Sequence, residues 1–109
     1  MNKEIEQILE FQKDRDWKQF HSPKNLAISL VLEATEALEC FQWSKDNNLS
    51  EERVSQFGQE LADVYYYLLL LAHETGIDIK NEFWKKIELN ASKYPVDKSK
   101  GSSKKYNHL

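Results

Sequence analysis

Apolar residues recur along the chain with helical spacing in four segments, which polar or aromatic stretches separate. The first predicted helix covers about residues 2–14, where Ile5, Ile8 and Leu9 form one stripe. The second covers about residues 22–43, because its opening Ser-Pro pair is typical of a helix start. An Asp-Asn-Asn cluster follows it and predicts a turn.

The other two predicted helices have equally clear ends. Residues 50–75 begin with a serine and two glutamates, which suit the first turn of a helix, and Gly76 suits the position just after its end. Residues 78–94 begin with a capping aspartate, and Pro95 stops the helix. The pattern therefore predicts two long central helices and two shorter ones.

Composition agrees with an all-helical fold. The 109 residues include only 3 Gly and 2 Pro, too few for the many tight turns of an all-β protein. No apolar run approaches the ~20 residues of a membrane span. We expect an all-α four-helix bundle over residues 1–95 and a basic tail over residues 96–109. The single Cys excludes an internal disulfide framework and favours a reducing, cytoplasmic location.

The net charge of −3 hides an uneven distribution. The tail has four lysines against one aspartate, whereas residues 25–75 have nine acidic residues against Lys45 and Arg53. Such an acidic segment is a poor partner for nucleic acid, because phosphates favour basic surfaces. It is a good partner for a divalent cation.

Four of these acidic residues lie on helix faces that are otherwise apolar. Glu33 and Glu36 share one face of the second predicted helix, and Glu60 and Asp63 share one face of the third. Carboxylates that point into a core need a counter-charge, and Mg²⁺ prefers carboxylate oxygen. Solvated acids at the edge of the apolar face are the alternative, and the spacing leaves both open.

Other cofactor sites fit the sequence less well. A di-iron bundle needs Glu-x-x-His on two helices, and none of the three histidines follows a glutamate at that spacing. No Cys–His cluster indicates zinc, and no glycine-rich loop indicates a phosphate cradle. A phosphate-bearing ligand would therefore be held through metal and side chains.

The acids and their flanks resemble the MazG-like, all-α nucleoside triphosphate pyrophosphohydrolases. Glu33-x-x-Glu36 followed by Glu60-x-x-Asp63 is similar to the signature of that family. The segments RDWKQFHSPKNL, FQW, ELADVYYYL, NASKYP and SSKKY resemble its dCTP pyrophosphatase branch and occur in the same order.

The resemblance implies a reaction and a set of metal ligands. Such enzymes cleave a nucleoside triphosphate into the monophosphate and pyrophosphate with Mg²⁺, for which Mn²⁺ can substitute. Glu33, Glu36, Glu60 and Asp63 would be both the metal ligands and the catalytic residues. Glu39, one turn on, is a further candidate for orienting the attacking water, or simply a surface acid.

The resemblance also implies contacts with the nucleotide. Trp17 and Trp43 would hold the base, with His21 and Tyr67 nearby, although packing in the core is the ordinary role of such aromatics. Further residues would reach the sugar or the phosphates from the end of the fourth helix and from the tail: Asn90, Lys93, Tyr94, Lys104, Lys105 and Tyr106. For the lysines, a solvated and flexible end is the alternative.

Assembly and function follow from the same features. A small bundle with acids facing its core gains stability by association, and the family implies a homodimer or a homotetramer built from dimers. We expect a nucleotide-pool enzyme acting on dCTP or related deoxynucleotides. The alternatives are a different or broad base preference, such as dATP or dUTP, and a non-catalytic helical module that binds an ion.

Overall fold

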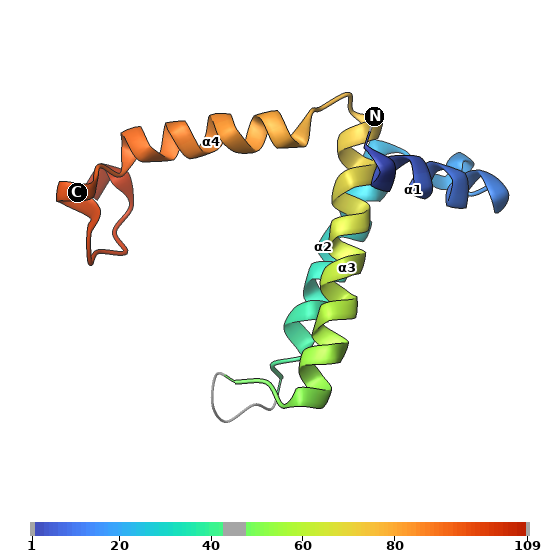
Figure 1. The fold of residues 1–109 in the computed structure, drawn as a ribbon, viewed down its shortest axis with the longest axis horizontal. Helices are drawn as coiled ribbons and strands as arrows, with labels where there is room; N and C mark the ends of the chain where they lie inside the picture. Colours follow the sequence, from blue (N-terminus) through green and yellow to red (C-terminus); the bar gives the residue numbers. More distant parts are fainter. Residues whose placement is uncertain (1, 43–47, 109) are drawn as a thin grey trace. The chain divides into compact units, whose positions relative to one another are not determined.

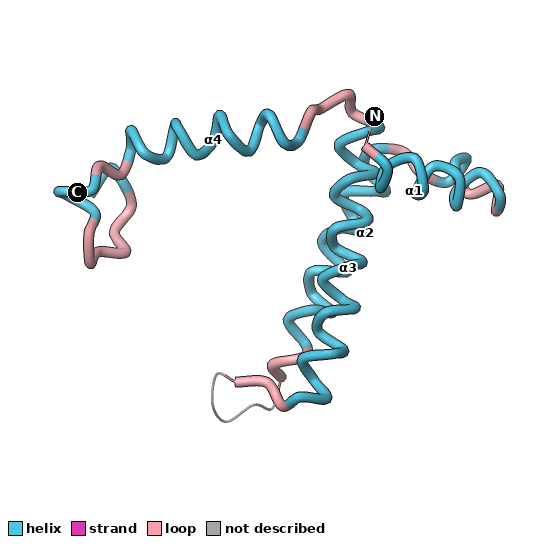
Figure 2. The backbone as a smooth tube through the Cα atoms, in the orientation of Figure 1, coloured by secondary structure: helices cyan, strands magenta, loops and turns pink. Residues whose placement is uncertain are grey.

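The structure is a computed structural model that describes residues 2–42 and 48–108, and every ordered element in these ranges is helical. The main helices are α1 (Lys3–Asp14), α2 (Pro23–Glu39), α3 (Glu51–Glu74) and α4 (Ile79–Lys93), and loops join them (Figures 1 and 2). Three short elements complete the chain: the 3₁₀ helices η1 (Lys18–Phe20) and η2 (Tyr106–His108), and α5 (Val96–Ser99). The predicted all-α class is confirmed.

The chain divides into two compact units, residues 1–76 and residues 77–109. The first contains α1, η1, α2 and α3, and the second contains α4, α5 and η2. The four-helix bundle and the division at residue 95 stay predictions. In the described ranges, no helix is both long enough and apolar enough to cross a bilayer.

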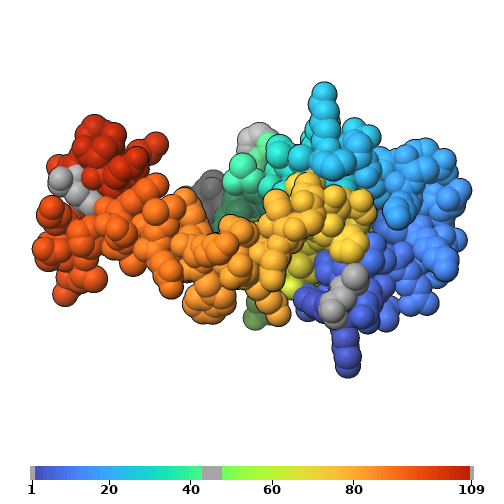
Figure 3. All heavy atoms as spheres, turned by 90° about the horizontal axis from the view of Figure 1, so that it is seen from above, coloured from blue at the N-terminus to red at the C-terminus, as the bar shows by residue number. Residues whose placement is uncertain are grey.

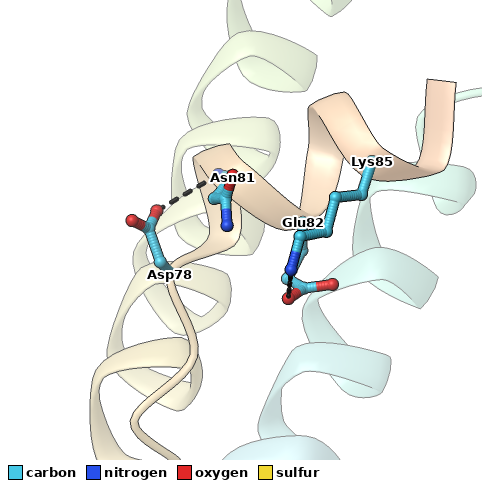
Figure 4. A network of polar contacts seen from close by, with 4 residues as sticks. All are labelled: Asp78, Asn81, Glu82 and Lys85. Atoms are coloured by element: carbon cyan, nitrogen blue, oxygen red, sulfur yellow. Dashed lines mark hydrogen bonds and ion pairs between the residues drawn. The ribbon is translucent and has the colours of Figure 1, made fainter. Parts of the chain in front are cut away.

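The starts of α2, α3 and α4 are fixed by the caps that the sequence predicts. Ser22, Ser50 and Asp78 each accept a hydrogen bond from the backbone N–H three residues on, at 3.2–3.3 Å. Figure 4 shows the cap of α4, where Asp78 accepts from Asn81, beside the ion pair between Glu82 and Lys85. These bonds satisfy N–H groups that have no partner within the helix.

In the first unit, α2 and α3 lie side by side along most of their length (Figure 1). Leu26 of α2 and Leu70 of α3 are fully buried between the elements of this unit. Burying one such side chain contributes about 1.5–3 kcal/mol relative to leaving it in water. The pairing of these two helices is therefore the structural base on which the acidic residues of both are placed.

Helix α1 packs on the C-terminal half of α3. Gln12 of α1 is almost completely buried and donates a hydrogen bond to the Tyr66 hydroxyl. Nearer the surface, the Tyr65 hydroxyl donates to the carboxylate of Glu4. The space-filling view shows the residues of α1, in blue, against the end of α3, in yellow (Figure 3).

Helix α2 ends at Glu39, earlier than the predicted end near Trp43. The reason is a tertiary contact, because the guanidinium of Arg53 in α3 donates to the carbonyls of Cys40 (2.9 Å) and Gln42 (3.2 Å). Arg53 thereby satisfies carbonyl groups that the helix leaves without partners at its end.

The tail of the second unit has more structure than a flexible end. It contains α5 and η2. The centroid of the Tyr106 ring lies 6.2 Å from that of the Tyr94 ring and 4.7 Å from Nζ of Lys93. These contacts show that the tail folds back to the end of α4. Lys104 and Lys105, between these elements, are exposed.

Candidate active site

Three carboxylates meet between α2 and α3. Glu33 and Glu36 are one turn apart on α2, and Glu60 faces them from α3. One carboxylate oxygen of each lies within 4.8 Å of the others, which is close enough for all three to bind one ion. We call these three residues the acidic group. The i,i+3 spacing and the pairing of the two helices bring it together.

The acidic group is electrostatically strained as it stands. Burial, a hydrogen bond with Glu36 and repulsion from the neighbouring acids together raise the pKa of Glu33 to about 7. Burial also raises the pKa of Glu60. A hydrogen bond with Glu36 and the charge of Glu36 act in the same direction. A raised pKa means that the charged forms are disfavoured where they stand.

Among the residues that the structure describes, no cationic side chain pairs with these carboxylates. In residues 2–42 and 48–108, no lysine or arginine forms an ion pair with the acidic group. One carboxylate oxygen of Glu33 and one of Glu60 are buried without a hydrogen-bond partner. Buried carboxylate oxygens that lack donors are suited to coordinate a cation, so the residues present fit a divalent metal ion.

Asp63 and Glu39 lie beside the acidic group rather than within it. The charge of Asp63, one turn after Glu60 on α3, contributes to the raised pKa of both Glu33 and Glu60. Glu39 contributes to the raised pKa of Glu60 alone. Both are exposed, and Glu39 lines a different cavity, of about 560 Å³, with Glu36 and Glu60.

A cavity of about 690 Å³ opens beside the acidic group, between α1, α2 and α3. Its lining combines two of the predicted acids, Glu33 and Asp63, with two of the predicted base-binding aromatics, Trp17 and Tyr67. The hydroxyl of Tyr67 is hydrogen-bonded to Ser29, and its pKa is raised by burial and by the charges of the two acids. The structure thus brings carboxylates and aromatic rings to one cavity, which we call the acid–aromatic cavity.

The aromatic side of this cavity includes residues that sequence reasoning missed. Phe11 packs edge-on against Trp17 at 5.6 Å and against Tyr66 at 6.3 Å between ring centroids. Arg15 and Tyr66 also line the cavity. The four-residue spacing of Phe11 and Arg15 on α1 puts them on one face and was the available signal, but it does not show which element that face meets.

One predicted base-binding residue, His21, is not at this cavity. His21 lines a separate cavity of about 390 Å³ with Gln12 and His73, where its Nδ1 atom is buried without a partner. It lies there because η1 follows the sharp turn at Asp16, whose φ is 53°. Trp43 lies outside the described residues.

The remaining predicted residues belong to the second unit. Among the six, Lys93, Tyr94 and Tyr106 are brought together by the folded-back tail, and Asn90 accepts the backbone hydrogen bond of Tyr94 at 2.8 Å. Their part in a nucleotide site stays a prediction.

Known proteins are similar to this chain in sequence and in fold. Residues 28–109 match the MazG-like family. The chain is 40% identical over 106 residues to dCTP pyrophosphatase 1 of Mus musculus and 37% identical over 105 residues to that of Homo sapiens. Each alignment covers 92% of this chain but 62% of the relative, so the chain spans less than two thirds of the length of these relatives.

A solved structure agrees with the sequence match. A pyrophosphatase from Archaeoglobus fulgidus superposes with a TM-score of 0.79 at 37% sequence identity, covering 84% of this chain and 88% of the other. The sequence match covers both acid-bearing helices, and the fold match covers most of the chain. The chain therefore belongs to the MazG-like family.

Proposed function

We propose that this protein hydrolyses nucleoside triphosphates, with dCTP or a related deoxynucleotide preferred, to the monophosphate and pyrophosphate. The observation that carries the proposal is the acidic group at the edge of a cavity with an aromatic wall. One part suits the charged phosphates through a cation, and the other suits a base. The names of the relatives, dCTP pyrophosphatase 1 and pyrophosphatase, support the reaction and the base.

The proposed cofactor is Mg²⁺, or Mn²⁺ in its place. Glu33, Glu36 and Glu60 would hold it, with Asp63 as the fourth ligand. When bound, the ion supplies positive charge against the phosphate oxygens and lowers the pKa of coordinated water. The unpartnered oxygens of Glu33 and Glu60 support this assignment.

The reaction needs a group that accepts a proton from the attacking water. Water adds to the α-phosphorus, the bond to the oxygen that bridges the α- and β-phosphorus atoms breaks, and pyrophosphate leaves with that oxygen. We propose a glutamate of the acidic group, or Glu39, as the group that accepts the proton.

The aromatic wall would hold the base. Stacking of a base on an aromatic ring contributes about 1–3 kcal/mol, and Trp17 and Tyr67 both line the acid–aromatic cavity. We keep Trp43 and His21 as proposed base contacts. We propose sugar or phosphate contacts for Asn90, Lys93, Tyr94, Lys104, Lys105 and Tyr106.

We also propose a cytoplasmic homodimer or homotetramer. Large apolar side chains of α4, among them Phe83, Trp84 and Ile87, are exposed within their own unit, as are Val31 and Leu38 of α2. A second copy that covers such side chains would remove them from water. Sedimentation should show an assembly larger than a 12.9 kDa monomer at micromolar concentration.

Product analysis tests the proposed function. Incubation of dCTP with the protein and Mg²⁺ should give dCMP and pyrophosphate in equal amounts, and chelation should stop the reaction. Release of orthophosphate instead of pyrophosphate would show a different reaction. No product from any common triphosphate would favour a module that only binds an ion.

A further inference from the structure

Arg15 is the cationic side chain of the acid–aromatic cavity. Its guanidinium carbon lies 3.7 Å from the centroid of the Phe11 ring and 6.0 Å from that of Trp17. Its Nη1 atom also donates to the backbone carbonyl of Phe11 at 3.2 Å. A ring on one face and a carbonyl at one end fix the plane of the guanidinium, so less side-chain freedom remains to be lost on binding.

The other donors of Arg15 have no partner among the described residues. Across residues 2–42 and 48–108, no carboxylate forms an ion pair with Arg15, and Phe11 provides its one hydrogen-bond acceptor. A guanidinium has five N–H groups in a planar fork. Most of that fork is therefore available to a ligand in the cavity that Arg15 lines.

The position of Arg15 favours the base over the phosphates. It is held on the aromatic wall by Phe11 and Trp17, whereas the cation that would bind the phosphates belongs to the acidic group. A base stacked on that wall would present its edge to the same region. The guanidinium would then face the ring nitrogens and carbonyl oxygens of the base.

We infer that Arg15 reads the base, an inference that rests on the proposed function. Two parallel N–H donors match two adjacent acceptors, as in the pairing of arginine with guanine O6 and N7. Cytosine offers such a pair in N3 and O2. Uracil and thymine carry a hydrogen on N3, which would face a guanidinium N–H. Arg15 is thus a specificity residue that favours cytosine over uracil.

Two substitutions at Arg15 and one control test this inference. Arg15→Ala removes the fork, and Arg15→Lys keeps a charge without the two parallel donors. The control is Lys13→Ala, which removes a cation from the same helix but from the separate cavity that His21 lines. For each protein, kcat/KM is measured for dCTP and for dUTP, and circular dichroism checks the helical fold.

We expect both Arg15 variants to lose about 10- to 100-fold in kcat/KM for dCTP and to change less than about threefold for dUTP. The Lys13→Ala control should keep the ratio of the wild-type protein. Equal losses for dCTP and dUTP, or full activity of Arg15→Lys on dCTP, would overturn the inference, since both indicate a contact with phosphate or a purely structural role.

The test also separates this inference from the proposed function. A wild-type protein that hydrolyses neither triphosphate contradicts the proposed function. Calorimetric titration with dCMP and dUMP then measures the base preference of Arg15 by affinity, without turnover. A preference for dCMP that Arg15→Ala removes supports base reading, and equal affinities of the wild-type protein for the two overturn it.

Discussion

Helix α3 carries two regions in which polar groups lie among apolar side chains, and the two have opposite character. Toward α2, Glu60 meets Glu33 and Glu36, and buried oxygens are left without donors. Toward α1, Tyr66 accepts a hydrogen bond from buried Gln12, whose own amide oxygen is buried without a partner. The second region joins a donor to an acceptor across two helices, whereas the first brings like charges together. The strain in the first region is therefore the best indication of where the protein works.

Removing one acid should give the largest effect. Glu60→Gln should lower kcat/KM for dCTP by at least about 100-fold, because it removes a proposed ligand of the metal ion. The same change should leave the melting temperature equal or higher in the absence of metal, because a disfavoured buried charge is removed. Steady-state kinetics and thermal unfolding measure the two effects.

The matched control is Glu88→Gln, which removes one exposed acid from α4. This variant should keep wild-type activity. If Glu60→Gln stayed active, or if it were destabilised by several kcal/mol, the acidic group would have a structural role instead.

Removing the hydrogen bond between Gln12 and Tyr66 should affect stability more than activity. Gln12→Leu and Tyr66→Phe should each lower the free energy of unfolding by about 1–3 kcal/mol, because each leaves its partner, half-buried Tyr66 or buried Gln12, without this hydrogen bond. The double variant should lose less than the sum of the two, since it leaves no unpaired partner. Denaturant unfolding of the four proteins gives this coupling.

Tyr65→Phe is the control for the same pair of helices. It removes the exposed hydrogen bond to Glu4 and should cost less than about 1 kcal/mol. Losses that simply add in the Gln12–Tyr66 double variant would show that this hydrogen bond does not join α1 to α3.

A smaller effect should appear in the pH dependence of the metal-free protein. The pKa of Glu33 is about 7 in the folded chain and near 4.5 when unfolded. The folded state therefore binds the extra proton between these values, and its contribution to stability is present below pH 4.5 and is lost as the pH rises to 7. Thermal unfolding with a chelator should show this decline, and Glu33→Gln should reduce it. An unchanged slope in Glu33→Gln would assign the titration to another group.

The sequence predicts the acidic group better than it predicts the contact between α1 and α3. Glu33, Glu36 and Glu60 could be chosen as candidates because each lies on an otherwise apolar helix face, although their spacing left a solvated position open. Ser22 and Ser50 similarly mark the starts of their helices through local hydrogen bonds. The caps, and the position of each acid on an apolar face, depend on neighbours along one helix.

The features that sequence reasoning missed depend on contacts between distant segments. The wall of Phe11, Arg15 and Tyr66 exists because α1 packs on α3, which the period of α1 does not specify. The end of α2 is set by Arg53, a residue of the next helix. His21 lies at another cavity because of the turn before η1, where the backbone at Asp16 adopts a positive φ.

The central claim is that the acidic group is a site for a divalent cation that holds the triphosphate. A crystal structure with Mg²⁺ and a dCTP analogue with a non-hydrolysable α,β-imido bridge tests it most directly. The account predicts a metal ion bound by Glu33, Glu36 and Glu60, with the triphosphate on it and the base in the cavity of Trp17 and Arg15. An analogue bound elsewhere, with no metal on these carboxylates, would contradict it.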